Sequence, residues 1–181
     1  MFTTTVTPRP TETSRTMPGD DLVPRPDTVM NRAFTLPAPP GTVWPWFNQL
    51  GRNRAGWYLP ARLERAVPRR RRALRHIEPA LQQLRAGDII DDWGGRQATF
   101  EIVTHEAPHT LVHRSTRGRL HISWAITLTP EEPGTTRVHL RFRISGVGHR
   151  RLAEYGGGLI DLLTVAALAA GIRERLTAAD R

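Results

Sequence analysis

The sequence predicts an α+β fold in which a curved antiparallel sheet wraps around one long C-terminal helix. Residues 159–176 predict that helix, because residues 162–170 are apolar on every side apart from Thr164, and leucine and alanine favour helices. From residue 87 onward the hydrophobic pattern has a period of two, which predicts the sheet. At about 1.5 Å per residue the helix is roughly 27 Å long, a length that a strand of about eight residues covers. We therefore expect a helix with little solvent-facing surface.

Length, composition and charge limit the possible functions. The chain has 181 residues, enough for one domain with a full core and an internal cavity. It contains no cysteine, which excludes disulfides and thiolate chemistry. The net charge of +9 comes from arginine alone and is a weak argument for a nucleic-acid partner, so we expect none. The start of the chain lacks a basic region followed by an apolar run, and the apolar part of the C-terminal helix is too short for a bilayer. We expect a cytoplasmic protein with no membrane span.

The chain divides into a terminal arm and one domain. Residues 1–30 are rich in threonine and proline and poor in large apolar side chains, which predicts a flexible arm. The predicted domain covers residues 31–178 and begins with a short strand over residues 31–36. After a proline-rich break, Thr42 is placed to cap a helix that stops at Gly51.

A basic stretch lies between the predicted helices and the predicted sheet. Short helices are expected over residues 61–67 and 79–84, on either side of the arginines 69–72 and Arg75. No aromatic side chain is interleaved with these arginines for base stacking, so we interpret them as a solvated face. The alternative is a docking patch for an acidic acyl carrier protein, an interaction that salt would weaken.

Five segments alternate between apolar and polar residues and predict the strands. The predicted strands cover residues 88–93, 98–106, 110–116, 120–129 and 135–145. Gly94 and Gly95 mark the first hairpin turn. In the last strand the apolar residues Val138, Leu140, Phe142 and Ile144 are expected to face the core, and Arg137, His139, Arg141 and Arg143 to face water.

This order of elements resembles the helix-grip fold of the START/Bet v 1-like superfamily, and specifically the bacterial SRPBCC group of polyketide cyclase/dehydrase and lipid-transport-like proteins. The resemblance covers about residues 31–178. It is carried by residues 43–46 (VWPW), 49–51 (QLG), 54–58 (RAGWY), 63–64 (LE), 87–88 (GD), 124–125 (WA), 136–137 (TR) and 171–175 (GIRER).

The resemblance implies a cavity between the concave sheet and the long helix. A pocket of this kind suits a small hydrophobic molecule such as a polyketide or a terpenoid. Strand parity and the position of the glycine-flanked loop provide the expected ligand-binding residues, which are Trp57, Trp93, Phe100, Ile102, Trp124, Leu140, Phe142 and Tyr155.

Three side chains are candidates for proton transfer in such a pocket. His113 falls on the same strand face as the inward-pointing Trp124, and an imidazole moves protons near neutral pH. Asp91 would act as a carboxylate with a pKa raised by burial, and Tyr58 lies in the loop over the cavity mouth. Each has a structural alternative, since a lone histidine on an apolar strand is commonly a hydrogen-bonded core residue. The parity also leaves open whether His113 or His121 is the cavity histidine.

No other catalytic signature stands out. The sequence contains no GxSxG elbow, Walker loop or Rossmann glycine pattern, and His105, His109 and His113 fall on different elements, so no metal site is expected. Any catalysis should therefore need no cofactor. Two functions follow: a cofactor-independent cyclase or dehydratase of specialised metabolism, or a non-catalytic carrier or sensor of a small hydrophobic molecule.

Overall fold

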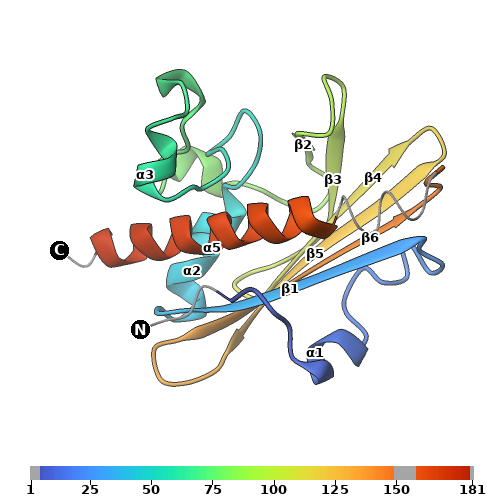
Figure 1. Cartoon of the computed structure of the whole chain (residues 1–181), viewed down its shortest axis with the longest axis horizontal. Helices are drawn as coiled ribbons and strands as arrows, with labels where there is room; N and C mark the ends of the chain where they lie inside the picture. Colours follow the sequence, from blue (N-terminus) through green and yellow to red (C-terminus); the bar gives the residue numbers. More distant parts are fainter. Residues whose placement is uncertain (1–4, 149–157, 180–181) are drawn as a thin grey trace.

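The computed structural model describes residues 5–148 and 158–179 and contains one six-stranded antiparallel sheet (Figure 1). The strand order is β1-β6-β5-β4-β3-β2. The strands are β1 (Thr28–Leu36), β2 (Ile89–Asp91), β3 (Thr99–Glu106), β4 (Thr110–Arg117), β5 (Leu120–Pro130) and β6 (Thr136–Ser145). The helices α2 (Pro40–Asn48), α3 (Ala61–Glu64) and α5 (Gly158–Ala179) cover the inner face, and two 3-10 turns lie at Arg69–Arg71 and Pro79–Gln82.

The period-two pattern places the expected side chains on the inner face. Trp124 on β5 pairs with Phe142 on β6 and with His113 on β4, so these three side chains share that face. His121 lies on the opposite face and is exposed, so of the two histidines only His113 shares the face of Trp124. The predicted α+β architecture, with a sheet around a long C-terminal helix, is confirmed.

Helix α5 is buried along only one side. Its buried side chains Val165, Leu168, Ala169, Ile172 and Leu176 follow helical spacing. The first turns differ from the prediction of little exposed surface, because the sheet covers one side of the helix. The exposed fractions of Leu159, Ile160 and Leu163 are 58%, 65% and 62%. No helix in the described ranges is both long enough and apolar enough to cross a membrane.

Residues 5–27 pack on the outer face of the sheet, which differs from the flexible arm expected from their composition (Figure 1). This segment contains the short helix α1 (Pro10–Ser14) and buries Val6, Met17 and Val23. The outer residues of β6 are therefore covered rather than facing water. The composition did not predict this packing, because three buried apolar side chains are enough to anchor the segment when its other contacts with the sheet are polar.

Guanidinium groups on β6 hold the N-terminal segment. Arg141 is 3% exposed and donates to the carbonyls of Glu12, Thr13 and Arg15, to the Asp20 carboxylate and to Asn31 Oδ1, over distances of 2.7–3.0 Å. Four residues earlier on the strand, Arg137 donates to both carboxylate oxygens of Glu12 at 2.8 Å. A buried cation needs such partners, so the outer face of the sheet requires this segment.

A buried arginine also fixes the loop between α2 and β2 against α5. Arg175 is 1% exposed, and it donates to the carbonyls of Leu59 and Leu74 at 3.0 and 2.8 Å and to Glu64 Oε1 at 2.5 Å. One turn earlier, Gly171 allows the helix to approach the loop closely, because a Cβ there would lie 2.6 Å from the Tyr58 carbonyl oxygen. The loop is thereby held on the helix.

We expect Glu12→Gln to destabilise the protein in a pH-dependent way. Burial raises the pKa of Glu12, but the hydrogen bonds from Arg137 and from the Arg9 N–H outweigh it and lower the pKa to about 2. The carboxylate therefore stabilises the fold above its unfolded pKa of about 4.3 and loses this effect as the pH falls toward 2. Urea unfolding should show a loss of about 1–3 kcal/mol at pH 7 that shrinks at pH 3. The exposed Glu132→Gln is the control, and an equal loss at both pH values would contradict the assignment.

We expect Gly171→Ala to separate the loop from α5. The nearest atoms to the added Cβ belong to the backbone of Tyr58 and Leu59, which cannot rotate away. Overpacking of this kind costs about 1–3 kcal/mol, measurable by chemical unfolding. Gly41→Ala is the matched control, because a Cβ there meets nothing within 4 Å. Equal stability of the two variants would show that the close approach is dispensable.

Candidate functional site

A cavity of about 650 Å³ lies between the inner face of the sheet and the first half of α5. Side chains from the loop after α2, from the hairpin between β2 and β3, and from β3, β4, β5, β6 and α5 surround it. Its lining residues are Trp57, Asp92, Trp93, Gly94, Phe100, Arg117, Leu120, Ile122, Trp124, Phe142, Ile144, Asp161, Thr164 and Val165. A cavity of this size and composition accommodates a small, largely apolar molecule.

Aromatic rings form one wall of the cavity. The ring centroid of Trp57 lies 5.3 Å from that of Trp93 and 6.3 Å from that of Trp124, and Phe100 lies 6.1 Å from Trp124. The Trp57 indole N–H donates to the Thr164 carbonyl of α5 at 3.1 Å. Because Trp57 belongs to the loop that Arg175 holds, the rigid contact between loop and helix also positions this wall.

One ion pair lies where the first hairpin meets the cavity. Arg117 at the end of β4 donates to the Asp92 carboxylate, and its guanidinium lies 5.4 Å from the centre of the Phe100 ring. Its Nε donates to Ser115 Oγ at 2.9 Å, and the Trp93 N–H donates to Asp92 Oδ1 at 2.7 Å. These contacts hold a carboxylate and a guanidinium at the edge of an otherwise apolar surface.

A second ion pair joins α5 to β1. Asp161 Oδ2 lies 2.9 Å from Arg32 Nε, and Arg32 also donates to the Gly158 carbonyl at 2.8 Å. Burial raises the pKa of Asp161, while the neighbouring Arg32 opposes this effect. Asp161 is thus a carboxyl group of the cavity that holds its proton more readily than an ordinary aspartate does.

His113 lies behind the aromatic wall and does not line the cavity. The side chain is 2% exposed, its ring stacks on Trp124 at 4.8 Å, and Phe100 packs on it at 5.6 Å. Its Nδ1 is 3.1 Å from the Trp124 carbonyl oxygen, which accepts the hydrogen bond. Burial lowers the pKa of His113 to about 4, so the imidazole is neutral at pH 7. Proton transfer by His113 would require the aromatic wall to open.

The other two candidates for proton transfer also lie outside the cavity. The Tyr58 hydroxyl is buried and donates to the Trp46 carbonyl at 2.9 Å, and burial raises its pKa. Asp91 accepts a hydrogen bond of 2.7 Å from the Asn53 amide at the end of β2. The structure therefore does not bring His113, Asp91 and Tyr58 together around one space.

Five of the eight expected ligand-binding residues line the cavity: Trp57, Trp93, Phe100, Trp124 and Phe142. Ile102 and Leu140 are core residues, with exposed fractions of 0% and 3%. Tyr155 lies outside the described residues. Sequence reasoning did not select Arg117 for the site. A sequence feature that could have identified it is its position at the end of a predicted strand, next to a hairpin that contains two aspartates, Asp91 and Asp92.

Polar side chains elsewhere are engaged separately. His105 Nε2 is 2.7 Å from Asn48 Oδ1, and His109 Nδ1 is 3.1 Å from the Leu128 carbonyl. Across the described part of the chain, no group of three histidine, cysteine, aspartate or glutamate side chains is arranged to hold a metal ion.

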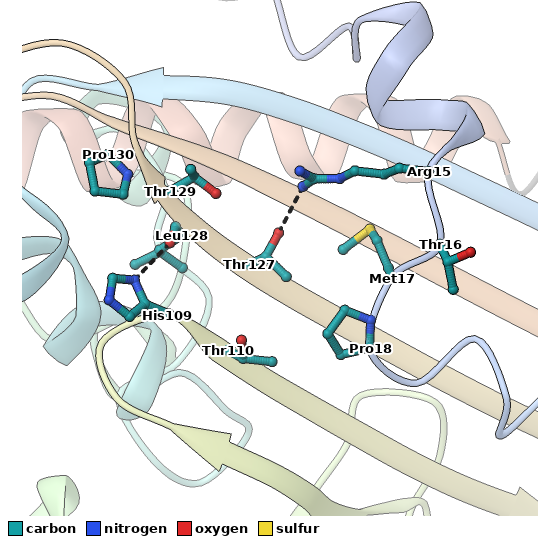
Figure 2. A pocket seen from close by; sticks show the side chains of 10 residues that line it. All are labelled: Arg15, Thr16, Met17, Pro18, His109, Thr110, Thr127, Leu128, Thr129 and Pro130. Atoms are coloured by element: carbon teal, nitrogen blue, oxygen red, sulfur yellow. Dashed lines mark hydrogen bonds between the residues drawn. The ribbon is translucent and has the colours of Figure 1, made fainter.

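A smaller hollow of about 320 Å³ lies on the outer face, between the N-terminal segment and strands β4 and β5 (Figure 2). Figure 2 shows Arg15 reaching toward Thr127 and His109 bonded to the Leu128 carbonyl. Threonines and prolines make up much of its surface. With half the volume and no aromatic wall, it is a weaker candidate than the inner cavity.

Comparison with known proteins identifies the fold. No protein-family model matches the sequence, and no curated protein matches it either. Among solved structures, CalU16 from Micromonospora echinospora is similar, with 17% identity, a TM-score of 0.52 and coverage of 80% of this chain and 74% of its own. Protein Ms6760 from Mycobacterium smegmatis has 15% identity, a TM-score of 0.50 and coverage of 83% and 92%.

These similarities cover most of the chain, including the sheet and the long C-terminal helix, and they show its fold. The resemblance read from the sequence is confirmed at the level of architecture: the chain has the helix-grip fold.

Proposed function

We propose that the protein binds a small, largely apolar molecule in the inner cavity and acts on it as a cofactor-independent enzyme of the cyclase or dehydratase type. The observation that carries this proposal is the position of Asp161, a carboxyl group with a raised pKa on the wall of an aromatic cavity. A protonated carboxyl group donates a proton, and an apolar cavity holds a flexible substrate in a reactive conformation while excluding water.

Within this proposal Asp161 is the general acid, and Arg32 stabilises the carboxylate that remains after proton transfer. The pair formed by Asp92 and Arg117, which also lines the cavity, orients a polar group of the substrate. The indole rings of Trp57, Trp93 and Trp124 shape the substrate. Polyketide-like and terpenoid-like molecules of specialised metabolism match these requirements, because they are apolar, flexible and reactive through proton transfer.

A non-catalytic carrier or sensor is the second candidate function. The observation that favours it is that His113, Tyr58 and Asp91 all lie outside the cavity, so few groups there can move protons. A carrier needs only the apolar walls and the ion pairs that orient its ligand.

The first experiment is mass spectrometry of small molecules extracted from the protein purified from its native producer. The protein freed of ligand is then incubated with the molecule found and with its biosynthetic precursor. Conversion of the precursor supports the enzyme. Recovery of the bound molecule unchanged, without precursor turnover, supports the carrier.

We expect Leu120→Trp to abolish ligand retention. Leu120 lines the cavity and is half-buried, so an indole there fills space that the ligand needs. The extracted ligand should fall below about one tenth of the amount bound by the unsubstituted protein, since filling the space removes most apolar contacts. Leu63→Trp, on the exposed side of α3, is the control. Equal retention by both variants would move the ligand out of this cavity.

We expect Asp161→Asn to lower turnover while ligand binding persists. An amide has nearly the same shape but no acidic proton, so kcat should fall about 100-fold or more with little change in affinity. In the unsubstituted enzyme the rate should decline as the pH rises through the raised pKa of Asp161, because the acid form is then lost. Unchanged kcat in Asp161→Asn, with Asp91→Asn as comparison, would remove Asp161 from the mechanism.

A further inference from the structure

A third hollow, of about 700 Å³, borders the inner cavity and is lined by many positively charged side chains. Six arginines line it from three separate segments, and no carboxylate does. They are Arg52, Arg54, Arg70, Arg71, Arg72 and Arg96. We call this hollow the arginine cleft. The arginines at 70–72 were interpreted from the sequence as part of a solvated face; they are exposed, and the structure also gathers them with distant arginines around one concave surface.

The arginines of the cleft form no ion pairs with carboxylates in the described part of the chain. Within residues 5–148 and 158–179 none of the six forms an ion pair, whereas Arg32, Arg117, Arg137, Arg141 and Arg175 each pair with a carboxylate. Like charges placed around one hollow repel one another. An arrangement of this kind is stabilised when an anion binds between them.

Backbone carbonyls hold half of these arginines in position without removing their charge. Arg52 donates to the carbonyls of Asp92 and Gly95 at 3.1 and 2.5 Å, and Arg54 donates to those of Asn48 and Leu81 at 3.1 and 2.8 Å. Arg72 donates to the carbonyls of Val67 and Arg65 at 2.9 and 3.2 Å. Preorganised guanidinium groups bind phosphate oxygens well because little rotational freedom is lost.

The other arginines of the cleft are exposed and available. In the described structure Arg70, Arg71 and Arg96 have no side-chain hydrogen bond or ion pair. Nearby Arg75 differs, because it pairs with Glu64 at 2.8 Å and lies outside the cleft. Three guanidinium groups of the cleft therefore keep all their donors available to an anion in the hollow.

The arginine cleft and the apolar cavity meet at Trp57 and Trp93. Both indole rings line both hollows, and their centroids are 5.3 Å apart. A molecule that lies across this pair places its apolar part against Trp124 and Phe100 and its other end among the arginines.

We infer that the ligand is an amphiphile whose phosphate group binds in the arginine cleft while its apolar body occupies the cavity. This inference rests on the proposed function for its apolar half and extends it by naming the substrate class, a phosphate ester of a hydrophobic molecule. The concave shape of the cleft suits a small polyanion rather than the surface of an acidic protein.

Isothermal titration with decyl phosphate and with decanol, both below aggregation, tests the inference. The phosphate ester should bind about tenfold or more tightly than the alcohol, since it adds charge-assisted hydrogen bonds to the guanidinium groups. Added salt should reduce this difference. Equal affinities for the two compounds would overturn the inference.

The double variant Arg70→Gln/Arg71→Gln should lose the preference for the phosphate ester and keep the affinity for decanol. The matched control is Arg65→Gln/Arg69→Gln, which removes the same charge from exposed arginines of the same segment outside the cleft. An equal loss in the control would show a general charge effect and overturn the site.

The two halves of the inference fail separately. If Leu120→Trp leaves decanol binding unchanged, the cavity is not the apolar site and the proposed function fails, whatever the cleft binds. If decyl phosphate and decanol bind equally while an acidic acyl carrier protein binds through Arg70 and Arg71, the cleft is a protein-docking surface and the phosphate ester is wrong. Binding of inorganic pyrophosphate that depends on Arg70 and Arg71 supports the anion site alone.

Discussion

The buried guanidinium of Arg175 is the contact on which the functional face depends. It lies inside the protein with hydrogen bonds to two carbonyls of the loop and to Glu64, and it also packs over the Tyr58 ring at 4.8 Å. Moving the loop would leave a buried cation without partners, which is costly. Trp57 and the arginines of the cleft belong to this same loop, residues 51–75, apart from Arg96. One buried cation on α5 therefore positions both the aromatic wall and most of the arginine cleft.

Arginine side chains have three different roles in this chain, which differ in the partners that surround each guanidinium group. On the outer face of the sheet, Arg137 and Arg141 bind the carboxylates and carbonyls of the N-terminal segment. Around the cavity, Arg32 and Arg117 pair with Asp161 and Asp92. In the cleft the positive charge is held by carbonyls or left free. The net charge of +9 says little about partners by itself, whereas the gathering of six arginines and no carboxylate around one hollow marks a surface that is suited to an anion.

The alternating pattern predicted which face of the sheet each strand side chain occupies. It did not predict how deeply a side chain is buried or which distant residues a long side chain contacts. The alternation in β5 and β6 placed Trp124 and Phe142 on the inner face, because each successive side chain must point to the opposite side. Parity also placed His113 on that face but contained no information on depth, and two aromatic rings cover the imidazole. The pair between Arg117 and Asp92 joins strands through long side chains, which no short-range pattern encodes. The composition of the N-terminal segment did not predict that it packs on the sheet, because polar partners on β6 hold the segment and little apolar area is buried.

Occupancy of the cavity and the charge of Asp161 are physically linked. Burial already raises the pKa of this carboxyl group, and Arg32 opposes the rise. An apolar ligand that fills the cavity displaces water from the remaining exposed side of Asp161, so it favours the protonated form further. Protonation in turn weakens the attraction to Arg32, through which the first turns of α5 are held to β1. In the proposed function, ligand binding, proton uptake and the contact of α5 with the sheet would thus be coupled at one carboxyl group, Asp161.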